Sequence, residues 1–171
     1  MIENTTYIKR RPSQLVNVGH FFVFLIFVPL QFIPDKSLAV FIPAGLLPGT
    51  LEKYLLGLPV YLLSAAFFLL CYHLLKTRCI CYEINPEELQ YTSGIFHRKH
   101  EYIELYRIKD FQVDRPLLYR FFGLGTLVVY TSDKTTPVFR LEAIRKPEEV
   151  YTVLRGLVEL NRKEKHVYEI D

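Results

Sequence analysis

The sequence predicts a transmembrane α-hairpin followed by a small all-β domain that is capped by a C-terminal helix. Two long apolar stretches lie in the first half of the 171-residue chain. Short alternating runs separated by turn residues begin directly after the second stretch. One amphipathic pattern then closes the chain. We therefore divide the chain into a lead-in with a two-helix anchor, residues 1–78, and a β-rich domain, residues 79–171.

The second apolar stretch, Tyr54 to Leu75, contains 22 residues and no charged side chain. A helix of this length extends for about 33 Å, which matches a bilayer core of about 30 Å. Residues 54–75 are therefore predicted to span a membrane. Because the β-rich pattern starts almost immediately, at Cys79, the domain is expected to lie against the membrane surface.

The first apolar stretch, residues 15–33, is predicted to be a second span. It contains His20 near its start and Pro29 near its end. Proline is tolerated in a spanning helix because neighbouring helices or water satisfy the freed carbonyl group, so Pro29 is expected to kink the helix. His20 has no acidic partner inside either span, so a proton path is not favoured. His73, at the matching end of the second span, can face His20 across the hairpin.

Positive charges predict the orientation of the two spans. Lys9-Arg10-Arg11 precede the first span, and Lys76 and Arg78 follow the second. Basic flanks favour the cytoplasmic side. We therefore expect a multi-pass protein of the cell (inner) membrane with both termini in the cytoplasm. A cleaved signal peptide is the competing interpretation, but no convincing Ala-x-Ala-like site follows the first stretch.

The connector between the spans contains an apolar segment, residues 38–48. Its 11 residues are too few to cross a bilayer, and two prolines and a glycine interrupt it. We expect it to lie in the outer interface or to pack on the helix ends. Small residues in the second span, Gly57 and Ser64-Ala65-Ala66, allow close helix packing, either within the hairpin or between two copies of the chain in a homo-oligomer.

The charge balance of the β-rich half argues against one class of function. From Lys76 onward, 16 Lys and Arg residues stand against 15 Asp and Glu residues. A nucleic-acid-binding surface is therefore not expected. The three cysteines are expected to stay reduced on the cytoplasmic side or within the bilayer, so no disulfide framework is predicted.

Six β-strands are predicted after residue 78. A polar turn at residues 85–88 and a polar loop at residues 133–136 each join two of them. A slip of phase between Ile108 and Phe111 predicts a β-bulge. The strands are expected at residues 79–84, 89–93, 102–105, 108–113, 124–132 and 138–144.

The closing helix is expected at residues 147–163. Pro147 suits the first helical position, and Glu148 and Glu149 complement the positive end of the helix dipole. Apolar residues at spacings of three and four form one face, which is predicted to cover the open end of a small curved sheet.

Four segments of the β-rich half carry a family likeness. They are Gly94-Ile95-Phe96 with Arg98-Lys99, Ile103 to Ile108, Arg120 to Leu127 with the pattern Arg-x-x-Gly-x-Gly-x-Leu, and Pro147 to Tyr151. These segments resemble the bacterial membrane-associated PH-like domain family, in which YdbS-like proteins place two transmembrane helices before a PH-like domain. The resemblance implies a bent antiparallel barrel of about seven strands with a C-terminal helix as its cap. A seventh strand would be absent or hidden in residues 117–122.

Three glycines of the likeness are candidate turn residues. Gly123 and Gly125 have a phosphate-binding loop as the competing interpretation, but no Lys follows and their spacing fits neither a P-loop nor a dinucleotide fingerprint. We therefore predict structural turns at Gly94, Gly123 and Gly125, where glycine permits a positive φ.

Cys79 and Cys81 are predicted to point to the same face of one strand. A structural zinc site needs four ligands, and only His97 and His100 stand nearby. We therefore expect two half-buried thiols and no metal or other cofactor.

Basic residues are the best candidates for a surface that contacts lipid or a protein partner. A solvated strand face is the competing interpretation. In lipid-binding PH domains the first loop between strands is typically basic, whereas here it is Asn85-Pro86-Glu87-Glu88, so the resemblance does not imply recognition of a specific headgroup. The candidate residues are Arg98, Lys99, Arg107, Lys109, Arg115 and Arg120.

The expected function is binding and not catalysis. No nucleophile, carboxylate pair or metal triad has motif-grade spacing. We therefore predict a non-catalytic, membrane-anchored interaction or scaffold module at the cytoplasmic face, with another membrane or cytoplasmic protein as its partner. A sensor of anionic lipid headgroups, and an accessory subunit of a membrane transporter or enzyme complex, are the alternatives.

Overall fold

The computed structural model describes residues 8–30, 32 and 49–166. The chain forms two compact units. The helical unit covers Asn17–Leu74, and the sheet unit combines Met1–Val16 with Leu75–Asp171. The division at residue 78 that the sequence suggested therefore differs from the units of the structure, because the lead-in belongs with the β-rich half of the chain.

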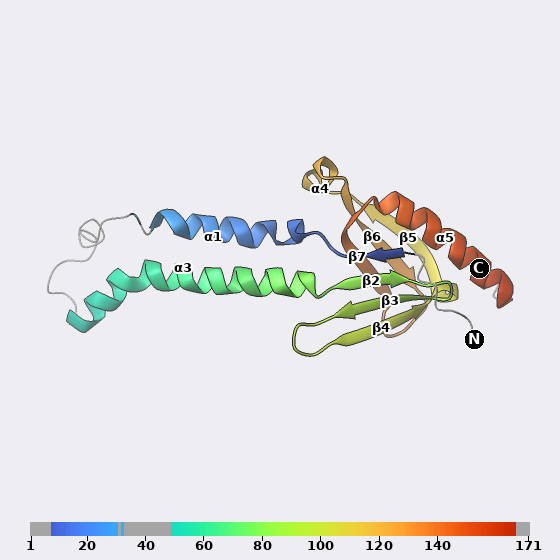
Figure 1. Ribbon diagram of the computed structural model, residues 1–171, viewed down its shortest axis with the longest axis horizontal. Helices are drawn as coiled ribbons and strands as arrows, with labels where there is room; N and C mark the ends of the chain where they lie inside the picture. The colour runs from blue at the N-terminus through green and yellow to red at the C-terminus, as the bar shows by residue number, and fades with distance from the viewer. Residues whose placement is uncertain (1–7, 31, 33–48, 167–171) are drawn as a thin grey trace. The chain divides into compact units, whose positions relative to one another are not determined.

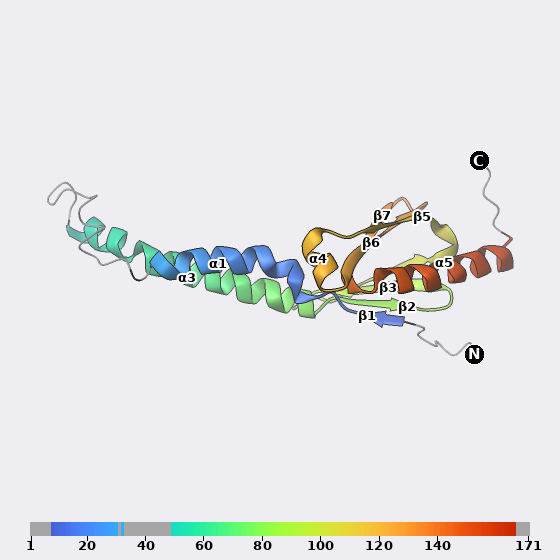
Figure 2. The same cartoon turned by 90° about the horizontal axis from the view of Figure 1, so that it is seen from above.

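Two apolar helices make up most of the helical unit and lie side by side (Figures 1 and 2). A short 3-10 helix, η1 (Gln14–Asn17), leads into α1 (Val18–Leu30), and the chain later returns through α3 (Gly49–Arg78). By length and composition α3 is able to cross a membrane, whereas α1 is a shorter apolar helix. One of the two predicted spans therefore has the dimensions of a membrane span. The segment 38–48 lies outside the described residues.

Apolar side chains on both helices face outward. The rings of Phe24 and Phe67 meet across the unit with centroids 6.2 Å apart. Away from this contact, Phe22 of α1 and Phe68 of α3 expose 59% and 71% of their surfaces. A helix that is apolar around its whole circumference needs an apolar environment on its outer side.

Two antiparallel sheets form the sheet unit. The first has the strand order β1-β2-β3-β4 and the second the order β5-β6-β7. The 3-10 helix η2 (Leu105–Arg107) joins the sheets, and α4 (Leu117–Phe121) connects β5 to β6. The strands are β1 (Ile8–Arg10), β2 (Cys81–Ile84), β3 (Glu88–Ser93), β4 (Lys99–Glu104), β5 (Ile108–Asp114), β6 (Leu124–Thr131) and β7 (Val138–Arg145).

Among the described residues, the structure contains one strand more than the six that the sequence predicted. The additional strand is β1, which pairs antiparallel with β2 so that Ile8 lies opposite Ile84. Residues 117–122, the segment considered for a hidden strand, contain α4. The predicted bulge is present as a register shift between Ile108 and Asp110.

The C-terminal helix α5 (Pro147–Glu164) closes the space between the two sheets, as Figure 2 shows. Its first turn carries Pro147, Glu148 and Glu149, as predicted. The apolar face of α5 packs into a single core with both sheets. Fully buried members of that core include Leu89 and Ile103 of the first sheet, Leu127 and Leu141 of the second, and Leu154 of α5.

A buried tyrosine also joins the two sheets. The hydroxyl oxygen of Tyr82 in β2 accepts a hydrogen bond from the backbone N–H of Glu142 in β7, at 3.2 Å. Burial raises the pKa of Tyr82 above its ordinary value. The side chain therefore stays neutral even well above neutral pH.

The three predicted turn glycines differ in conformation. Gly94 and Gly123 have φ angles of 109° and 63°, in the region that favours glycine. Gly125 instead lies inside β6 and is not among the residues with positive φ. The expectation for Gly125 is therefore corrected: this position needs glycine for close approach, because an added Cβ would lie 2.7 Å from Cγ of Pro147.

Candidate functional site

The chain leaves the sheet unit and re-enters it at the same end of the sheets. Because β1 and β2 are antiparallel, the last residue of β1, Arg10, lies opposite Tyr82 near the start of β2. The backbone N–H of Ser13 donates a hydrogen bond to the carbonyl of Ala143, at 2.9 Å, which holds the exit segment, residues 11–16, against β7. We call this end of the sheet unit, with residues 11–16 and 75–80, the tether end.

A shallow hollow of about 500 Å³ lies on the outer face of the first sheet at the tether end. Arg11 and Arg78 border it beside the chain exits, and Arg98 borders it from the connection between β3 and β4. Thr92 and His100 also line it, and Thr92 Oγ1 and His100 Nδ1 lie 3.1 Å apart. We call this site the outer hollow.

The lysines around the outer hollow form ion pairs with carboxylates, whereas its arginines do not, although Arg11 is near enough to Glu83 to help lower the pKa of that carboxyl group. Lys9 forms an ion pair with Glu83 across β1 and β2, which raises the pKa of Lys9 and lowers that of Glu83. Lys99 pairs with Glu101, which raises the pKa of Lys99. Within the described ranges, the three arginines have no ion pair; they are Arg11, Arg78 and Arg98. The outer hollow is therefore suited to an anionic group.

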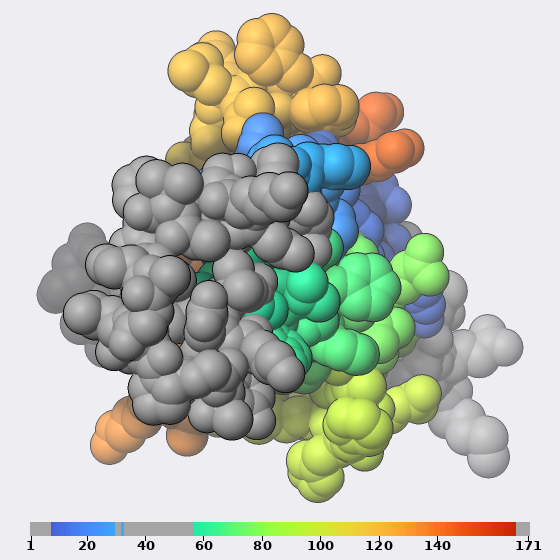
Figure 3. All heavy atoms as spheres, turned by 90° about the vertical axis from the view of Figure 1, so that its left-hand side faces the viewer, coloured from blue at the N-terminus to red at the C-terminus, as the bar shows by residue number. Residues whose placement is uncertain are grey.

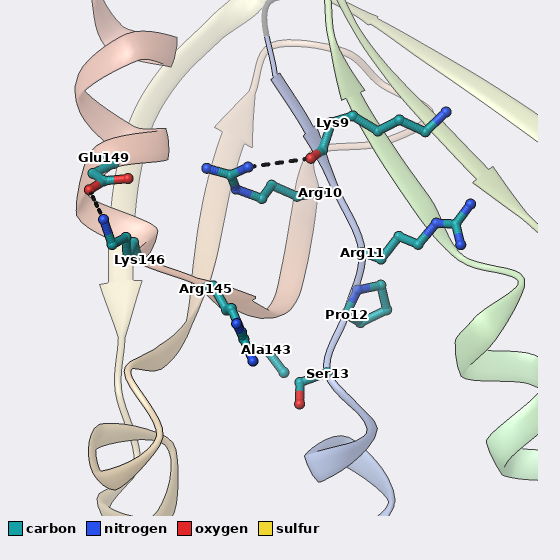
Figure 4. Close-up of a pocket in the computed structure, with 9 residues that line it drawn as sticks. All are labelled: Lys9, Arg10, Arg11, Pro12, Ser13, Ala143, Arg145, Lys146 and Glu149. Atoms are coloured by element: carbon teal, nitrogen blue, oxygen red, sulfur yellow. Dashed lines mark hydrogen bonds and ion pairs between the residues drawn. The ribbon is translucent and has the colours of Figure 1, made fainter.

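A second hollow of about 500 Å³ lies between β1 and the corner where β7 leads into α5 (Figure 4). Arg10 points into it, whereas Lys9 and Arg11 lie on the opposite side of β1. Arg145 and Lys146 add two further cations, and Lys146 is paired with Glu149 at 2.6 Å. Of these three consecutive basic residues, Arg10 borders the second hollow alone, whereas Lys9 and Arg11 border both hollows.

The six basic residues predicted as a surface do not form one site. Arg98 borders the outer hollow, and Lys99 is next to it in an ion pair. Arg107 lies at the opposite end of the sheets, where it pairs with Glu104 at 2.6 Å, and Lys109 follows in β5. Arg115 pairs with Glu148, and Arg120 is exposed on α4.

Sequence reasoning missed two of the three arginines of the outer hollow. Arg11 and Arg78 served there only as indicators of membrane orientation. Their sequence positions, directly before the first apolar stretch and directly after the second, were the available signal. The pairing of β1 with β2 is what brings the two flanks together beside Arg98.

Exposed apolar side chains project from the tether end at two places (Figure 3). One is the connection between β3 and β4, where Phe96 is 98% exposed. The other is α4 with the residue after it, where Phe121 is 85% exposed and Leu117, Leu118 and Phe122 are exposed as well. We call these two places the apolar tips. In Figure 3 the α4 tip is amber and the β3–β4 tip is yellow-green.

The remaining candidate chemistry is sparse. Cys79 and Cys81 are half-buried free thiols beside the outer hollow. Among the described residues, no group of three or more His, Cys, Asp or Glu side chains is placed to hold a metal ion. In the helical unit, His20 and His73 stack with ring centroids 3.8 Å apart.

The architecture by itself defines a class of protein. Two antiparallel sheets with a C-terminal helix packed into their shared core fit a PH-like all-β fold. Proteins of this class are generally non-catalytic interaction modules.

The profile described as the bacterial PH domain matches residues 23–158. The match begins within α1 and ends within α5, so it includes α3 and all strands from β2 to β7. The chain therefore belongs to the bacterial PH domain family. No curated protein and no solved structure gives a significant match.

Proposed function

We propose that this protein is a membrane-anchored PH-like interaction module that presents its sheet unit as a non-catalytic scaffold at the cytoplasmic face of the membrane. The observation that carries the proposal is the exposed apolar surface of α1 and α3, on which Phe22 is 59% and Phe68 71% exposed. Such a surface is stable in hydrocarbon and unfavourable in water. Membership of the bacterial PH domain family supports the interaction role.

The pairing of β1 with β2 supports a two-span anchor. Ile8 and Ile84 lie opposite each other in one sheet, so both must be on the same side of any membrane that the intervening chain crosses. The number of crossings between them is therefore even. If α3 is one of these crossings, an even number calls for a second, and we propose the segment that begins with α1 for it. Lys9-Arg10-Arg11, Lys76 and Arg78 favour the cytoplasmic side for the sheet unit.

Thiol labelling tests this topology. In a variant whose three native cysteines are replaced, one new cysteine is placed at Ser37, which lies outside the described residues, or at Ser132 in the loop between β6 and β7. On intact cells we expect a membrane-impermeant reagent to label position 37 and to miss position 132. Lysed cells serve as the control for position 132. Labelling of position 132 alone on intact cells would reverse the proposed orientation.

The outer hollow favours a second candidate function, a sensor of anionic lipid headgroups. Arg11, Arg78 and Arg98 have no ion pair within the described ranges and lie beside the segments that lead to the apolar helices. Each basic residue near an anionic leaflet contributes about 1 kcal/mol of attraction. If the protein instead binds a partner protein, or serves as an accessory subunit of a transporter or enzyme complex, these arginines only set the orientation of the sheet unit on the membrane.

Neutralising Arg98 and Lys99 together, as Arg98→Gln and Lys99→Gln, is expected to leave the full chain in the membrane fraction, because the apolar helices determine its location.

Hydrogen exchange in nanodiscs separates the interaction module from the headgroup sensor. If the protein is a headgroup sensor, anionic lipid slows backbone hydrogen exchange around the outer hollow, and Arg98→Gln abolishes this slowing. Lys134→Gln, at the opposite end of the sheets, is the matched control. An interaction module shows the same exchange in neutral and in anionic nanodiscs.

A further inference from the structure

We propose that the two apolar tips of the sheet unit insert into the interfacial layer of the same membrane that holds the apolar helices, and so fix the orientation of the sheet unit on that membrane. This inference rests on the proposed membrane anchoring. It assigns a lipid contact to residues outside the apolar helices, and it identifies the bilayer as the occupant of an otherwise uncovered apolar surface.

The exposure of the two tips needs an explanation. Phe96 is 98% exposed at the β3–β4 tip, and Phe121 is 85% exposed on α4. Single exposed apolar residues are ordinary on a protein surface. Here, however, Leu117, Leu118 and Phe122 are exposed around Phe121, so the α4 tip presents a cluster of large apolar side chains to its surroundings. Such a cluster marks an interaction surface.

Strand register places both tips at the tether end. Cys81, close to the end of α3, pairs with Thr92 of β3, and the β3–β4 tip begins two residues later at Gly94. Gly94 borders the outer hollow together with Arg78, which is the last residue of α3. The β3–β4 tip therefore lies beside the point where the chain returns from the apolar helices.

The α4 tip lies beside the other chain connection. Asp114 at the end of β5 pairs with Thr126 near the start of β6, so α4 is attached at the end of the sheet where β6 begins. Pro116 and Tyr119 border a further hollow together with Val16, the last residue of the exit segment. If the apolar helices occupy a bilayer, both connections lie at its surface, and each tip lies beside one of these connections.

Charge distinguishes a bilayer from a second copy of the chain as the occupant. Arg11, Arg78, Arg98 and Arg120 lie around the tips, and no ion pair is found for them in the described parts of the chain. A symmetric contact between two tether ends would bring these like charges together. An anionic leaflet instead attracts them while its interfacial layer accepts the aromatic rings.

The absence of tryptophan from the sequence allows a direct test on the full chain. Single substitutions Phe96→Trp and Phe121→Trp place one fluorophore on each tip at exposed positions. Lys134→Trp reports on the opposite end of the sheets, and Phe68→Trp reports on the apolar helix α3. Each variant is reconstituted into vesicles of phosphatidylcholine and phosphatidylglycerol, with and without lipid that is brominated at a shallow acyl position.

We expect bromine to quench the tryptophans at positions 96, 121 and 68 and to leave the tryptophan at position 134 unquenched. One result would overturn the inference and leave the membrane anchor intact: the tryptophan at position 68 is quenched, whereas the tryptophans at positions 96 and 121 emit as the one at position 134 does. A blue shift at 96 and 121 without quenching would also overturn it, because a protein would then cover the tips. If position 68 itself is unquenched, the proposed anchoring fails and this inference fails with it.

Discussion

Replacing Leu154 with alanine is expected to lower the free energy of unfolding of the sheet unit by about 2–5 kcal/mol. Leu154 lies in the middle of α5 and is fully buried in the core that this helix shares with both sheets. Truncation removes apolar contacts and leaves a cavity, because the two sheets cannot close completely on the smaller side chain. Small domains are stable by only about 5–15 kcal/mol, so this loss is a large part of the total.

Urea unfolding of the full chain in nanodiscs, followed by the near-ultraviolet circular dichroism of its tyrosines, measures the effect. Leu160→Ala is the matched control, because Leu160 is on the same helix and is 57% exposed. Its change is expected to stay within about 0.5 kcal/mol. Equal destabilisation by the two substitutions would contradict the packing of α5 as the cap of both sheets.

Gly125→Val is expected to destabilise the sheet unit by about 1–3 kcal/mol or more, through overpacking. A Cβ at this position would lie 2.7 Å from Cγ of Pro147 and 2.9 Å from Cγ of Arg115. It would also lie 3.3 Å from the backbone oxygen of Asp114, which cannot move as a side chain does. The substitution therefore forces β5, β6 and the start of α5 apart.

Gly156→Val is the matched control for this substitution. Gly156 lies in α5, and an added Cβ there meets nothing within 4 Å. Valine has a higher helix propensity than glycine, so the control is expected to be neutral or slightly stabilising. The same unfolding measurement compares the two variants. Equal stability of Gly125→Val and Gly156→Val would show that the contacts of Gly125 are not tight.

The helices and strands whose sequences show a short-range pattern were predicted from that pattern. The period of α5 and the turn residues around β2, β3, β6 and β7 are visible in short windows. β1 was missed because three residues show no period, and because it exists only through its pairing with β2, far along the chain. The five residues of α4 were missed for a similar reason, since a helix of little more than one turn carries no amphipathic signature.

The candidate site was predicted in part. Arg98 stood out within a basic run, but Arg11 and Arg78 join it only because β1 pairs with β2. The run also suggested one basic surface, whereas carboxylates close in sequence, Glu101 and Glu104, pair with Lys99 and Arg107. Gly125 was assigned a turn because sequence cannot separate a glycine needed for its φ angle from one needed for close approach.

The pairing of β1 with β2 has a consequence for biosynthesis. A ribosome makes β1 before the apolar helices and β2 after them, so the first strand has no partner until both helices have been synthesised. If insertion ends with the two helix flanks on opposite sides, β1 cannot reach β2, and the edge of the first sheet stays open to aggregation. On the proposed anchoring, completion of this four-stranded sheet is therefore a folding step that requires both flanks of the apolar helices to be on the same side of the membrane.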